Sequence, residues 1–295
     1  MNLGKKLALG TAQFGSNYGI ANARGRIPPE EISEILRYAV QKGIRTLDTA
    51  HAYGESELVL GKFLGEQPAL FRVITKLPQL EGEKTETQIA KVIEESLGRL
   101  NARKIYGYLI HHFQDFMKRP EIWNTLQAFK KKRIIAKIGF SLYHVDELEE
   151  LFRRGVVFDM LQVPYSIFDR RFEKQFSLLK EKNVEIHVRS IFLQGLAFLS
   201  PDQLPQPVQK AKDTLQALRK IAEKEEIAIN AMCLNFVLLN PSVDQVVIGI
   251  DSLQQLKNNV EDVRFFQKVR ALKDVLKPLA IEDEDVILPY RWSRG

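Results

Sequence analysis

The stretch PEEISEILRYAVQKGIRTLDTAHAYGESELVLG, residues 29–61, combines a helical pattern, a short strand and the start of a second helix. Apolar residues in its first half recur at the three- and four-residue spacing of a helix. Pro28 and Pro29 at the start of this helical pattern and Gly43 at its end are typical helix boundaries. The segment 45–50 then predicts a strand, and a loop leads from it into the next helix. Units of this kind build alternating α/β proteins.

The same alternation continues along the chain. Further helical patterns cover 85–100 and 145–155, between strand-like runs. The predicted strands are 6–12, 45–50, 72–77, 105–111, 136–142, 159–166, 185–191 and 244–250. Eight strand–helix units in roughly 250 residues predict a (β/α)8 barrel, a parallel eight-stranded barrel with outer helices, as one domain over residues 1–295. The alternative is an open doubly wound sheet, but the first turn, LGTAQFG, lacks the G-x-G-x-x-G pattern usual there.

The composition limits the kinds of partner that we expect. Cys233 is the only cysteine, so no intrachain disulfide can form, which fits a reducing cytoplasm. The net charge is +6, but the densest basic run, Lys130–Arg133, ends a predicted helix, where cations complement the helix dipole. No apolar run is long enough for a signal peptide or a membrane span. We therefore expect a cytoplasmic protein with no nucleic-acid or membrane partner.

Polar or ionisable side chains close most of the predicted strands. Parallel strands that are buried on both faces are usually apolar throughout, so these polar ends need another explanation. In a barrel, the carboxyl ends of the strands meet on one face, where active sites lie. The residues at or just beyond these ends are Asp48, Tyr53, Lys76, His111, Ser141, Gln162 and Arg189.

Four of these side chains form a set suited to proton transfer. A tyrosine is a poor acid at neutral pH, but a nearby lysine cation lowers its pKa. We expect Asp48 to hold Lys76, Lys76 to lower the pKa of Tyr53, and His111 to hydrogen-bond a substrate oxygen. Tyr53 could then protonate a carbonyl oxygen while hydride reaches the carbon. The hydride must come from a cofactor, because no side chain supplies one.

Two other histidines are less suited to such a site. Side chains alternate along a strand, so His111 and His112 should point in opposite directions, with His112 against a helix or behind the site. His51 lies in a loop and is expected to be a bystander. A metal site from Asp48, His51 and His111 is conceivable, but no H-x-x-H or H-x-x-x-H spacing supports it, and we expect no metal.

The motifs around these residues resemble those of the aldo-keto reductases, over roughly residues 5–265. GIRTLDTAHAYGESELVLGKFL is similar to the family signature G-x-R-x-x-D-T-A-x-x-Y-G-x-E, VITKL to its lysine strand, and YLIHHF to its Y-L-x-H strand. The resemblance implies a bacterial-type, NADPH-dependent reductase of an aldehyde or ketone, monomeric or weakly oligomeric. It makes Asp48, Tyr53, Lys76 and His111 the catalytic residues, with Tyr53 as general acid. The segment from about 265 to 295 should pack outside the barrel or over its mouth.

The resemblance also assigns cofactor contacts. Ser141 and Gln162 should bind the nicotinamide carboxamide, but Leu142 replaces a second amide partner of the family, an asparagine. Arg189 stands where many members stack an aromatic ring on the nicotinamide. Its guanidinium could stack there instead, or form an ion pair with a carboxylate at the barrel rim.

The nucleotide end of the cofactor site follows the last predicted strand. Asn259 matches the family's adenine contact, and Gln255 stands where members often carry a basic residue. We expect NADP(H), although Asp251 nearby makes NAD(H) possible, because an acidic side chain favours a ribose hydroxyl over a phosphate. An alternative to an enzyme is a cofactor-binding, redox-sensing regulatory protein of the same fold with little turnover.

Overall fold

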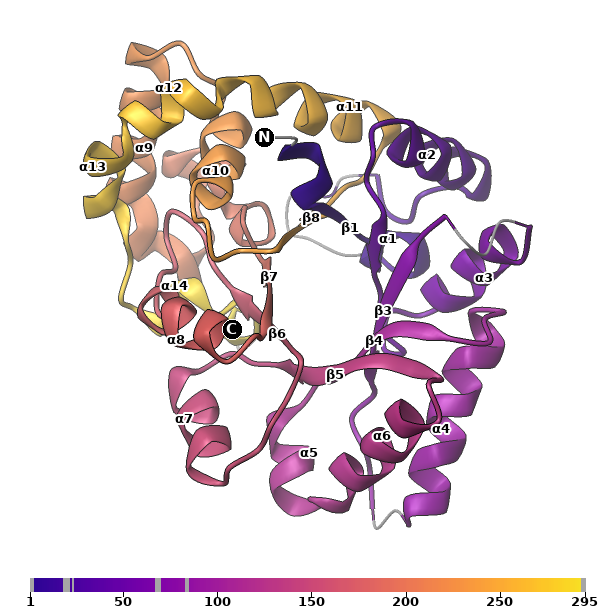
Figure 1. The fold of residues 1–295 in the computed structure, drawn as a ribbon. Coiled ribbons are helices and arrows are strands. Elements are labelled where there is room, and N and C mark those ends of the chain that lie inside the picture. Colours follow the sequence, from indigo (N-terminus) through magenta and orange to yellow (C-terminus); the bar gives the residue numbers. More distant parts are fainter. Residues whose placement is uncertain (1–2, 18–21, 23, 67–69, 83–84, 293–295) are drawn as a thin grey trace.

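The computed structural model describes residues 3–17, 22, 24–66, 70–82 and 85–292, and it confirms the predicted barrel. All eight strands are parallel, each pairs with the next along the chain, and β8 pairs with β1 (Figure 1). The strands are β1 (Leu7–Gly10), β2 (Thr46–Asp48), β3 (Arg72–Leu77), β4 (Ile105–Ile110), β5 (Ile135–Ser141), β6 (Met160–Pro164), β7 (Glu185–Arg189) and β8 (Gln245–Gly249). Every strand lies where the sequence predicts one, although most are shorter than predicted.

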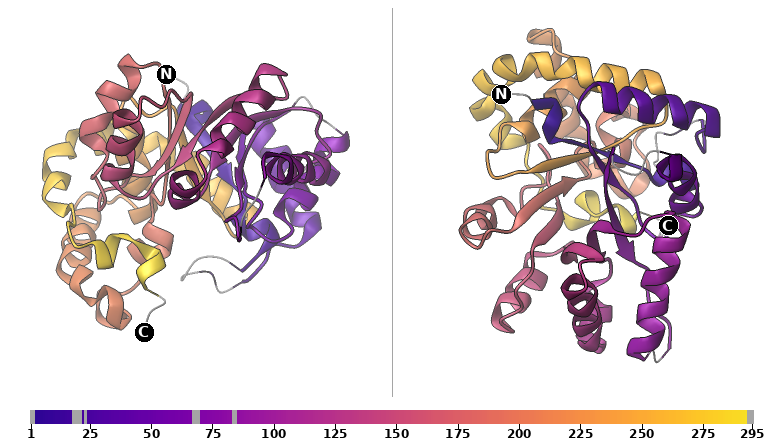
Figure 2. Two further views of the ribbon diagram at one scale, coloured as in Figure 1. Left: turned by 90° about the horizontal axis from the view of Figure 1, so that it is seen from below. Right: turned by 45° about the vertical axis from the view of Figure 1, so that its right-hand side comes forward.

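Helices surround this ring of strands on the outside, as two further views also show (Figure 2). The predicted helices correspond to α2 (Pro29–Gln41), α4 (Glu86–Arg99) and α7 (Val145–Arg153). The others are α1 (Ala12–Gly15), α3 (Ser56–Glu66), α5 (Phe113–Lys118), α6 (Glu121–Lys131), α8 (Phe176–Glu181), α9 (Lys212–Lys224), α10 (Ile229–Leu238), α11 (Leu253–Asp262), α12 (Phe266–Ala271), α13 (Lys273–Leu276) and α14 (Glu284–Ile287).

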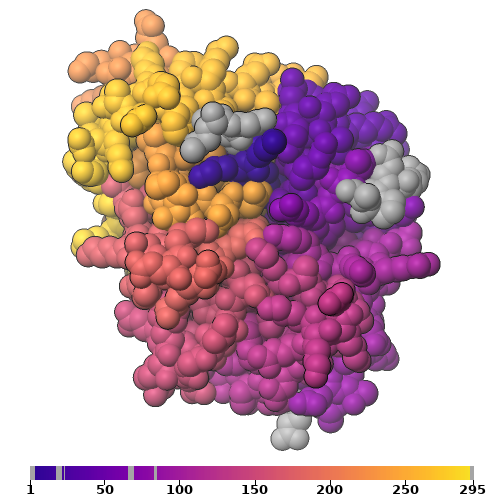
Figure 3. Space-filling model, viewed as in Figure 1, coloured from indigo at the N-terminus to yellow at the C-terminus, as the bar shows by residue number. Residues whose placement is uncertain are grey.

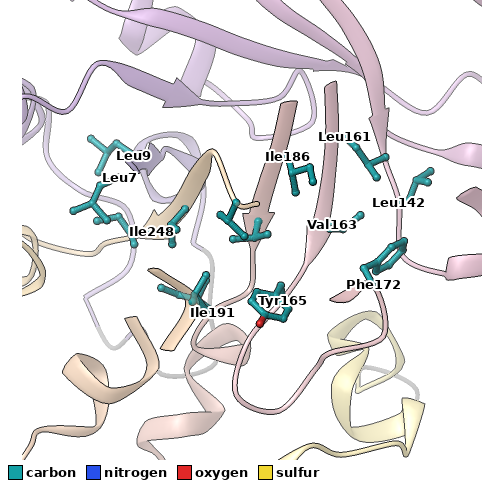
Figure 4. Close-up of a cluster of buried hydrophobic side chains, with 14 of the residues drawn as sticks. Leu7, Leu9, Leu142, Leu161, Val163, Tyr165, Phe172, Ile186, Ile191 and Ile248 are labelled. Carbon is teal, nitrogen blue, oxygen red and sulfur yellow. The ribbon is translucent and has the colours of Figure 1, made fainter. Parts of the chain in front are cut away.

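Alternate residues of each strand face the helices or the barrel interior. On β6, the buried side chains of Leu161 and Val163 belong to the large apolar core that includes the helices (Figure 4). Met160 and Gln162, which alternate with them in sequence, point inward, where Met160 packs on Ile74 and Leu109. The outward-facing residues therefore hold the helices on the barrel, and the inward-facing residues fill the barrel interior.

The barrel interior is filled by three layers of side chains. Ile74, Leu109 and Met160 form an apolar middle layer. The carboxyl ends of the strands place Asp48, Lys76 and Gln162 on one side of it. Toward the amino ends of the strands lie Lys137, Glu185 and His187, where Glu185 accepts a hydrogen bond from Tyr106 and pairs with the other two. Side chains fill the centre of the ring when the view of Figure 1 is drawn with all atoms (Figure 3).

The last part of the chain contacts the outer helices and the connections that follow β5 and β6. Helix α12 packs against α10. Further along, the ring of Tyr290 packs edge-on against Tyr143, at 5.1 Å between centroids, in the connection from β5 to α7. Glu284 accepts a hydrogen bond from Arg171 and pairs with His144. Within the ranges given above, no helix has the length and apolar character needed to cross a membrane.

Candidate active site

An ion pair between Asp48 and Lys76 forms the centre of the site. The Lys76 ammonium lies 2.8 Å from Asp48 Oδ2 and donates to the Thr49 carbonyl at 2.9 Å. The other carboxylate oxygen of Asp48 accepts a hydrogen bond from Gln162 Nε2 at 2.6 Å. All three side chains are buried. Burial lowers the pKa of Lys76, and the adjacent Asp48 carboxylate opposes that shift.

Tyr53 is held above this pair by a close backbone contact. A Cβ added to Gly15 would lie 1.9 Å from the Tyr53 carbonyl oxygen, so only glycine allows α1 to approach this loop. Gly54 has a φ of 57°, in the left-handed region that favours glycine. The centroid of the Tyr53 ring lies 5.1 Å from Lys76 Nζ and 6.1 Å from the His111 ring. The four side chains predicted as catalytic are therefore brought together.

Buried hydroxyl groups fix the strand end that carries Asp48. Thr11 Oγ1 donates to the Asp48 carbonyl at 3.0 Å and lies 2.8 Å from Ser56 Oγ. Thr49 Oγ1 donates to the same serine at 3.0 Å. Since Ser56 begins α3, this network joins the ends of β1 and β2 to the helix after Tyr53. The loop between Asp48 and Ser56 thus has both ends fixed.

His111 is a neutral imidazole in this environment. Burial lowers its pKa to about 2, and the positive charges of Lys76, His112 and Arg189 act in the same direction. His111 Nδ1 is buried and has no protein hydrogen-bond partner among the described residues. His112 is exposed and precedes α5, but its ring centroid lies 5.1 Å from that of His111, so the prediction that the two side chains point in opposite directions is wrong.

The direction of the Tyr53 pKa corrects the sequence-based expectation. Burial raises the pKa of Tyr53, the Asp48 carboxylate raises it further, and Arg189 lowers it in part. The net shift is opposite to the predicted lowering, because burial and the Asp48 carboxylate, which lies 2.8 Å from the Lys76 ammonium, outweigh the effect of the Lys76 cation on Tyr53. The phenol therefore stays protonated throughout the neutral range.

A cavity of about 310 Å³ opens beside Tyr53 and Asp48, within the size range of small-molecule sites. Of the predicted site residues, Asp48, Tyr53, Arg189 and Gln255 line it. The remaining lining residues are Gly10, Thr11, Ala12, Gln13, Asn22, Ser190, Ile191, Phe192, Gln194, Gly195, Phe198, Val247, Gly249 and Asp251. His51 is not among them, and the described residues contain no cluster of histidine, cysteine or carboxylate groups suited to a metal ion.

The residues assigned to the cofactor carry polar atoms that the protein leaves unpaired. Ser141 Oγ and Gln162 Oε1 are buried without a hydrogen-bond partner in the described structure, and so is Asn259 Nδ2. Each such group costs about 1–3 kcal/mol if nothing binds it. Ser141 and Gln162 are paired across β5 and β6, so their free atoms lie on neighbouring strand ends. A hydroxyl and an amide oxygen suit the donor and acceptor of a carboxamide.

Arg189 makes a contact that the sequence did not predict. Its guanidinium lies 4.1 Å from the centroid of the Tyr143 ring. It also donates to the Leu142 carbonyl at 3.1 Å and to Ser190 Oγ at 3.4 Å. No carboxylate among the described residues pairs with it.

The loop after β7 lines the cavity and was missed by the sequence analysis. Most of the residues in the segment 190–195 line the cavity. Ser190, Leu193, Gln194 and Gly195 all have positive φ values, between 48° and 98°. Backbone in this region is costly for residues other than glycine and often occurs at functional sites. Only Gly195 could have indicated such a turn in the sequence.

Comparisons with known proteins agree with this geometry. The model of the aldo/keto reductase family matches residues 6–271. The uncharacterized oxidoreductase YqkF of Bacillus subtilis is 24% identical over 277 residues, which cover 87% of this chain and 90% of that protein. A glyoxal reductase of the same organism is 27% identical over 235 residues, which cover 73% of this chain and 82% of that protein.

A solved structure shows the same fold. The aldo-keto reductase AKR11C1 of Bacillus halodurans, in its holo form, superimposes with a TM-score of 0.73 and 24% identity over 95% of both chains. The barrel, the residues at its strand ends and the family match over most of the length lead to one conclusion: the chain belongs to the aldo/keto reductase family.

Proposed function

We propose that the protein reduces an aldehyde or ketone to the alcohol with hydride from NADPH, and that Tyr53 is the general acid. The observation that carries this proposal is the position of Tyr53, whose ring faces the cavity above the buried Asp48–Lys76 pair. Because its pKa is raised, the phenol is protonated when the substrate binds. A protonated phenol can donate a hydrogen bond to a carbonyl oxygen.

The side chains then divide the proton chemistry among them. The nicotinamide cofactor supplies hydride when bound. As the carbonyl carbon gains hydride, its oxygen becomes strongly basic and takes the proton of the Tyr53 hydroxyl. The Lys76 ammonium stabilises the phenolate left behind, and Asp48 keeps that ammonium charged and in place. His111, neutral because its pKa is about 2, orients the carbonyl oxygen by a hydrogen bond and does not serve as the acid.

The chain's own residues suit a nicotinamide dinucleotide. Ser141 and Gln162 offer the unpaired hydroxyl and amide oxygen to the carboxamide, and Asn259 offers its free amide to the adenine. Gln255 lies in the cavity lining beside Asp251 and accepts a hydrogen bond from the Asp251 N–H at 2.8 Å. We propose NADP(H) as the cofactor and expect Asp251 to weaken its binding, because its carboxylate repels a ribose phosphate.

The test is NADPH oxidation by the purified protein across a panel of aldehydes and ketones. Wild-type protein should turn over several of them, and Tyr53→Phe should lose roughly 10²–10⁴-fold in kcat, the usual contribution of a general acid. Tyr106→Phe is the matched control, because Tyr106 lies at the other end of the barrel with its hydroxyl bonded to Glu185. Wild-type turnover in Tyr53→Phe would contradict the proposed mechanism.

The same experiment separates the enzyme from the alternative regulatory role. A redox-sensing protein should retain NADPH tightly and should fail to oxidise it when any of the carbonyl compounds is added. We expect turnover instead, by a cytoplasmic protein that is a monomer or weak oligomer. Its mass in solution, measured with and without NADPH, checks the oligomeric state.

A further inference from the structure

Arg189 brings an unbalanced positive charge to the cavity. It is the only lysine or arginine among the described residues that line the cavity, and no described carboxylate pairs with it. The other cation of the site, Lys76, is already balanced by Asp48 at 2.8 Å. Asp251, the remaining carboxylate of the lining, lies beyond β8 and forms no ion pair with Arg189. The end of the cavity that holds Tyr53 therefore has a net positive charge.

The guanidinium is held in place without using its full hydrogen-bonding capacity. One face stacks on Tyr143, and two N–H groups donate to Leu142 O and Ser190 Oγ. An arginine side chain has five N–H donors, so three have no protein acceptor in the described structure. All of the acceptors in use are uncharged. A fixed guanidinium with free donors matches a planar carboxylate, which it can bind through two parallel hydrogen bonds.

We propose that the physiological substrate is an oxo acid or aldehyde acid, whose carboxylate binds Arg189 while its carbonyl oxygen binds Tyr53. This inference rests on the proposed carbonyl reduction and narrows its substrate class. Both residues line the same cavity, and the positive charge of Arg189 acts to lower the pKa of Tyr53, Lys76 and His111, which places it near the reacting carbonyl. Neutral carbonyl compounds leave the guanidinium charge unpaired.

Oxo acids and their uncharged esters test the role of the substrate carboxylate directly. Glyoxylate, pyruvate and succinic semialdehyde are compared with their methyl or ethyl esters, with NADPH as reductant. At least one acid should exceed its ester in kcat/KM by about 10-fold or more, mainly through a lower KM, since hydrogen bonds to charged groups contribute about 1.5–3 kcal/mol. Equal kcat/KM for every acid and its ester would overturn the inference.

Two variants identify the residue responsible. Arg189→Gln should lower the acid-to-ester ratio of kcat/KM by about 10- to 100-fold, and Arg189→Lys should recover part of it, because lysine keeps the charge but not the planar fork. Arg153→Gln is the control. It removes an equal charge from an exposed position on α7, where the arginine pairs with Glu150, and it should leave the ratio unchanged.

The outcomes separate this inference from the proposed function. If Arg189 serves only the cofactor, Arg189→Gln weakens NADPH binding in a fluorescence titration and slows acids and esters equally, with no change in their ratio. That result overturns the inference and leaves carbonyl reduction intact. If no carbonyl compound is reduced, the proposed function itself fails.

Discussion

The two ends of the barrel interior contain the same four kinds of side chain in different states. Toward the carboxyl ends of the strands lie Asp48, Lys76, Tyr53 and His111. Toward the amino ends lie Glu185, Lys137, Tyr106 and His187. Each set has one carboxylate, one lysine, one tyrosine and one histidine. Ile74, Leu109 and Met160 separate the two sets.

The difference lies in what the carboxylate binds. Glu185 accepts a hydrogen bond from the Tyr106 hydroxyl at 2.8 Å, pairs with His187 Nε2 at 2.7 Å and forms an ion pair with Lys137. In that cluster, the tyrosine hydroxyl and the Nε2 atom of the histidine are bound to Glu185, and only His187 Nδ1 has no partner in the described structure. Asp48 binds Lys76 and Gln162 instead, and Tyr53 faces the cavity.

This comparison shows why residue types alone do not define an active site. A network whose carboxylate binds its tyrosine, lysine and histidine, and which lies away from the cavity, stabilises the fold and presents no group to a substrate. A network that leaves a tyrosine facing a cavity, with an imidazole close to that tyrosine, can act on a substrate. The position of the two networks agrees with the usual division of this fold between a functional and a stabilising face.

Separate replacement of Lys76 and of Lys137 by methionine should give the largest contrast in activity between the two ends of the barrel. Lys76→Met should lower kcat for carbonyl reduction by roughly 10²–10³-fold, because the phenolate of Tyr53 loses its nearby cation. Lys137→Met should keep near-normal kcat for each molecule that binds NADPH. The measurement is kcat with the concentration of folded protein set by NADPH titration. Equal losses in the two variants would contradict the assignment of separate roles.

Glu185→Gln should have the largest effect on stability. Burial raises the pKa of Glu185, but His187, Lys137 and Tyr106 outweigh it and hold the pKa at about 2. A carboxylate with a lowered pKa in the folded state stabilises the protein above its unfolded pKa of about 4.3. The contribution, about 3 kcal/mol, is lost as the pH falls from there toward 2.

Urea unfolding at several pH values measures that contribution. Wild type should exceed Glu185→Gln in the free energy of unfolding at pH 7, and the gap should shrink steadily below about pH 4. A gap that stays constant down to the acid limit of folding would show that the charge of Glu185 is not its cause.

Removal of the Ser141 hydroxyl should affect the cofactor and spare the fold. Ser141→Ala should weaken NADPH binding by about 3- to 10-fold, the value of one hydrogen bond. It should not destabilise the free protein, because the hydroxyl has no partner there. Ser96→Ala, which removes a buried hydroxyl beside Tyr108 on the outer side of the barrel, should leave NADPH affinity unchanged. Unaltered affinity in Ser141→Ala would remove this serine from the cofactor site.

The smallest expected effect concerns the nucleotide phosphate. Asp251→Ser should raise the affinity for NADPH relative to NADH by roughly two- to five-fold, because one repulsive charge at a solvent-accessible site contributes less than about 1 kcal/mol. Parallel titrations with the two cofactors give the ratio. A ratio that falls would mean that Asp251 favours the phosphate-bearing cofactor.

Most of the fold could be predicted from the sequence because its signals are local. The helical spacing of Ile32, Ile35 and Leu36 and the strand-like runs identify the elements, and the match of eight repeats to a closed barrel follows from their number. The convergence of Asp48 and Lys76 was also predictable, because parallel strands bring their carboxyl ends to one face.

Other features depend on side-chain directions that a sequence does not contain. The stacking of Arg189 on Tyr143 joins two strand ends separated by β6. The Gln162–Asp48 hydrogen bond and the raised pKa of Tyr53 both arise from burial in the assembled barrel. The left-handed backbone at Ser190 depends on the cavity-lining loop as a whole, and serine itself gives no signal for it.

Single-turnover hydride transfer tests the central claim most directly. Protein saturated with NADPH is mixed with an excess of an aldehyde substrate, and the loss of reduced-nicotinamide fluorescence is followed in wild type, Tyr53→Phe and Tyr106→Phe. We predict equal NADPH binding in all three, rapid loss of the signal in wild type and Tyr106→Phe, and almost none in Tyr53→Phe. Rapid loss in Tyr53→Phe, or slow loss in both variants alike, would contradict the assignment of the acid to the cavity end of the barrel.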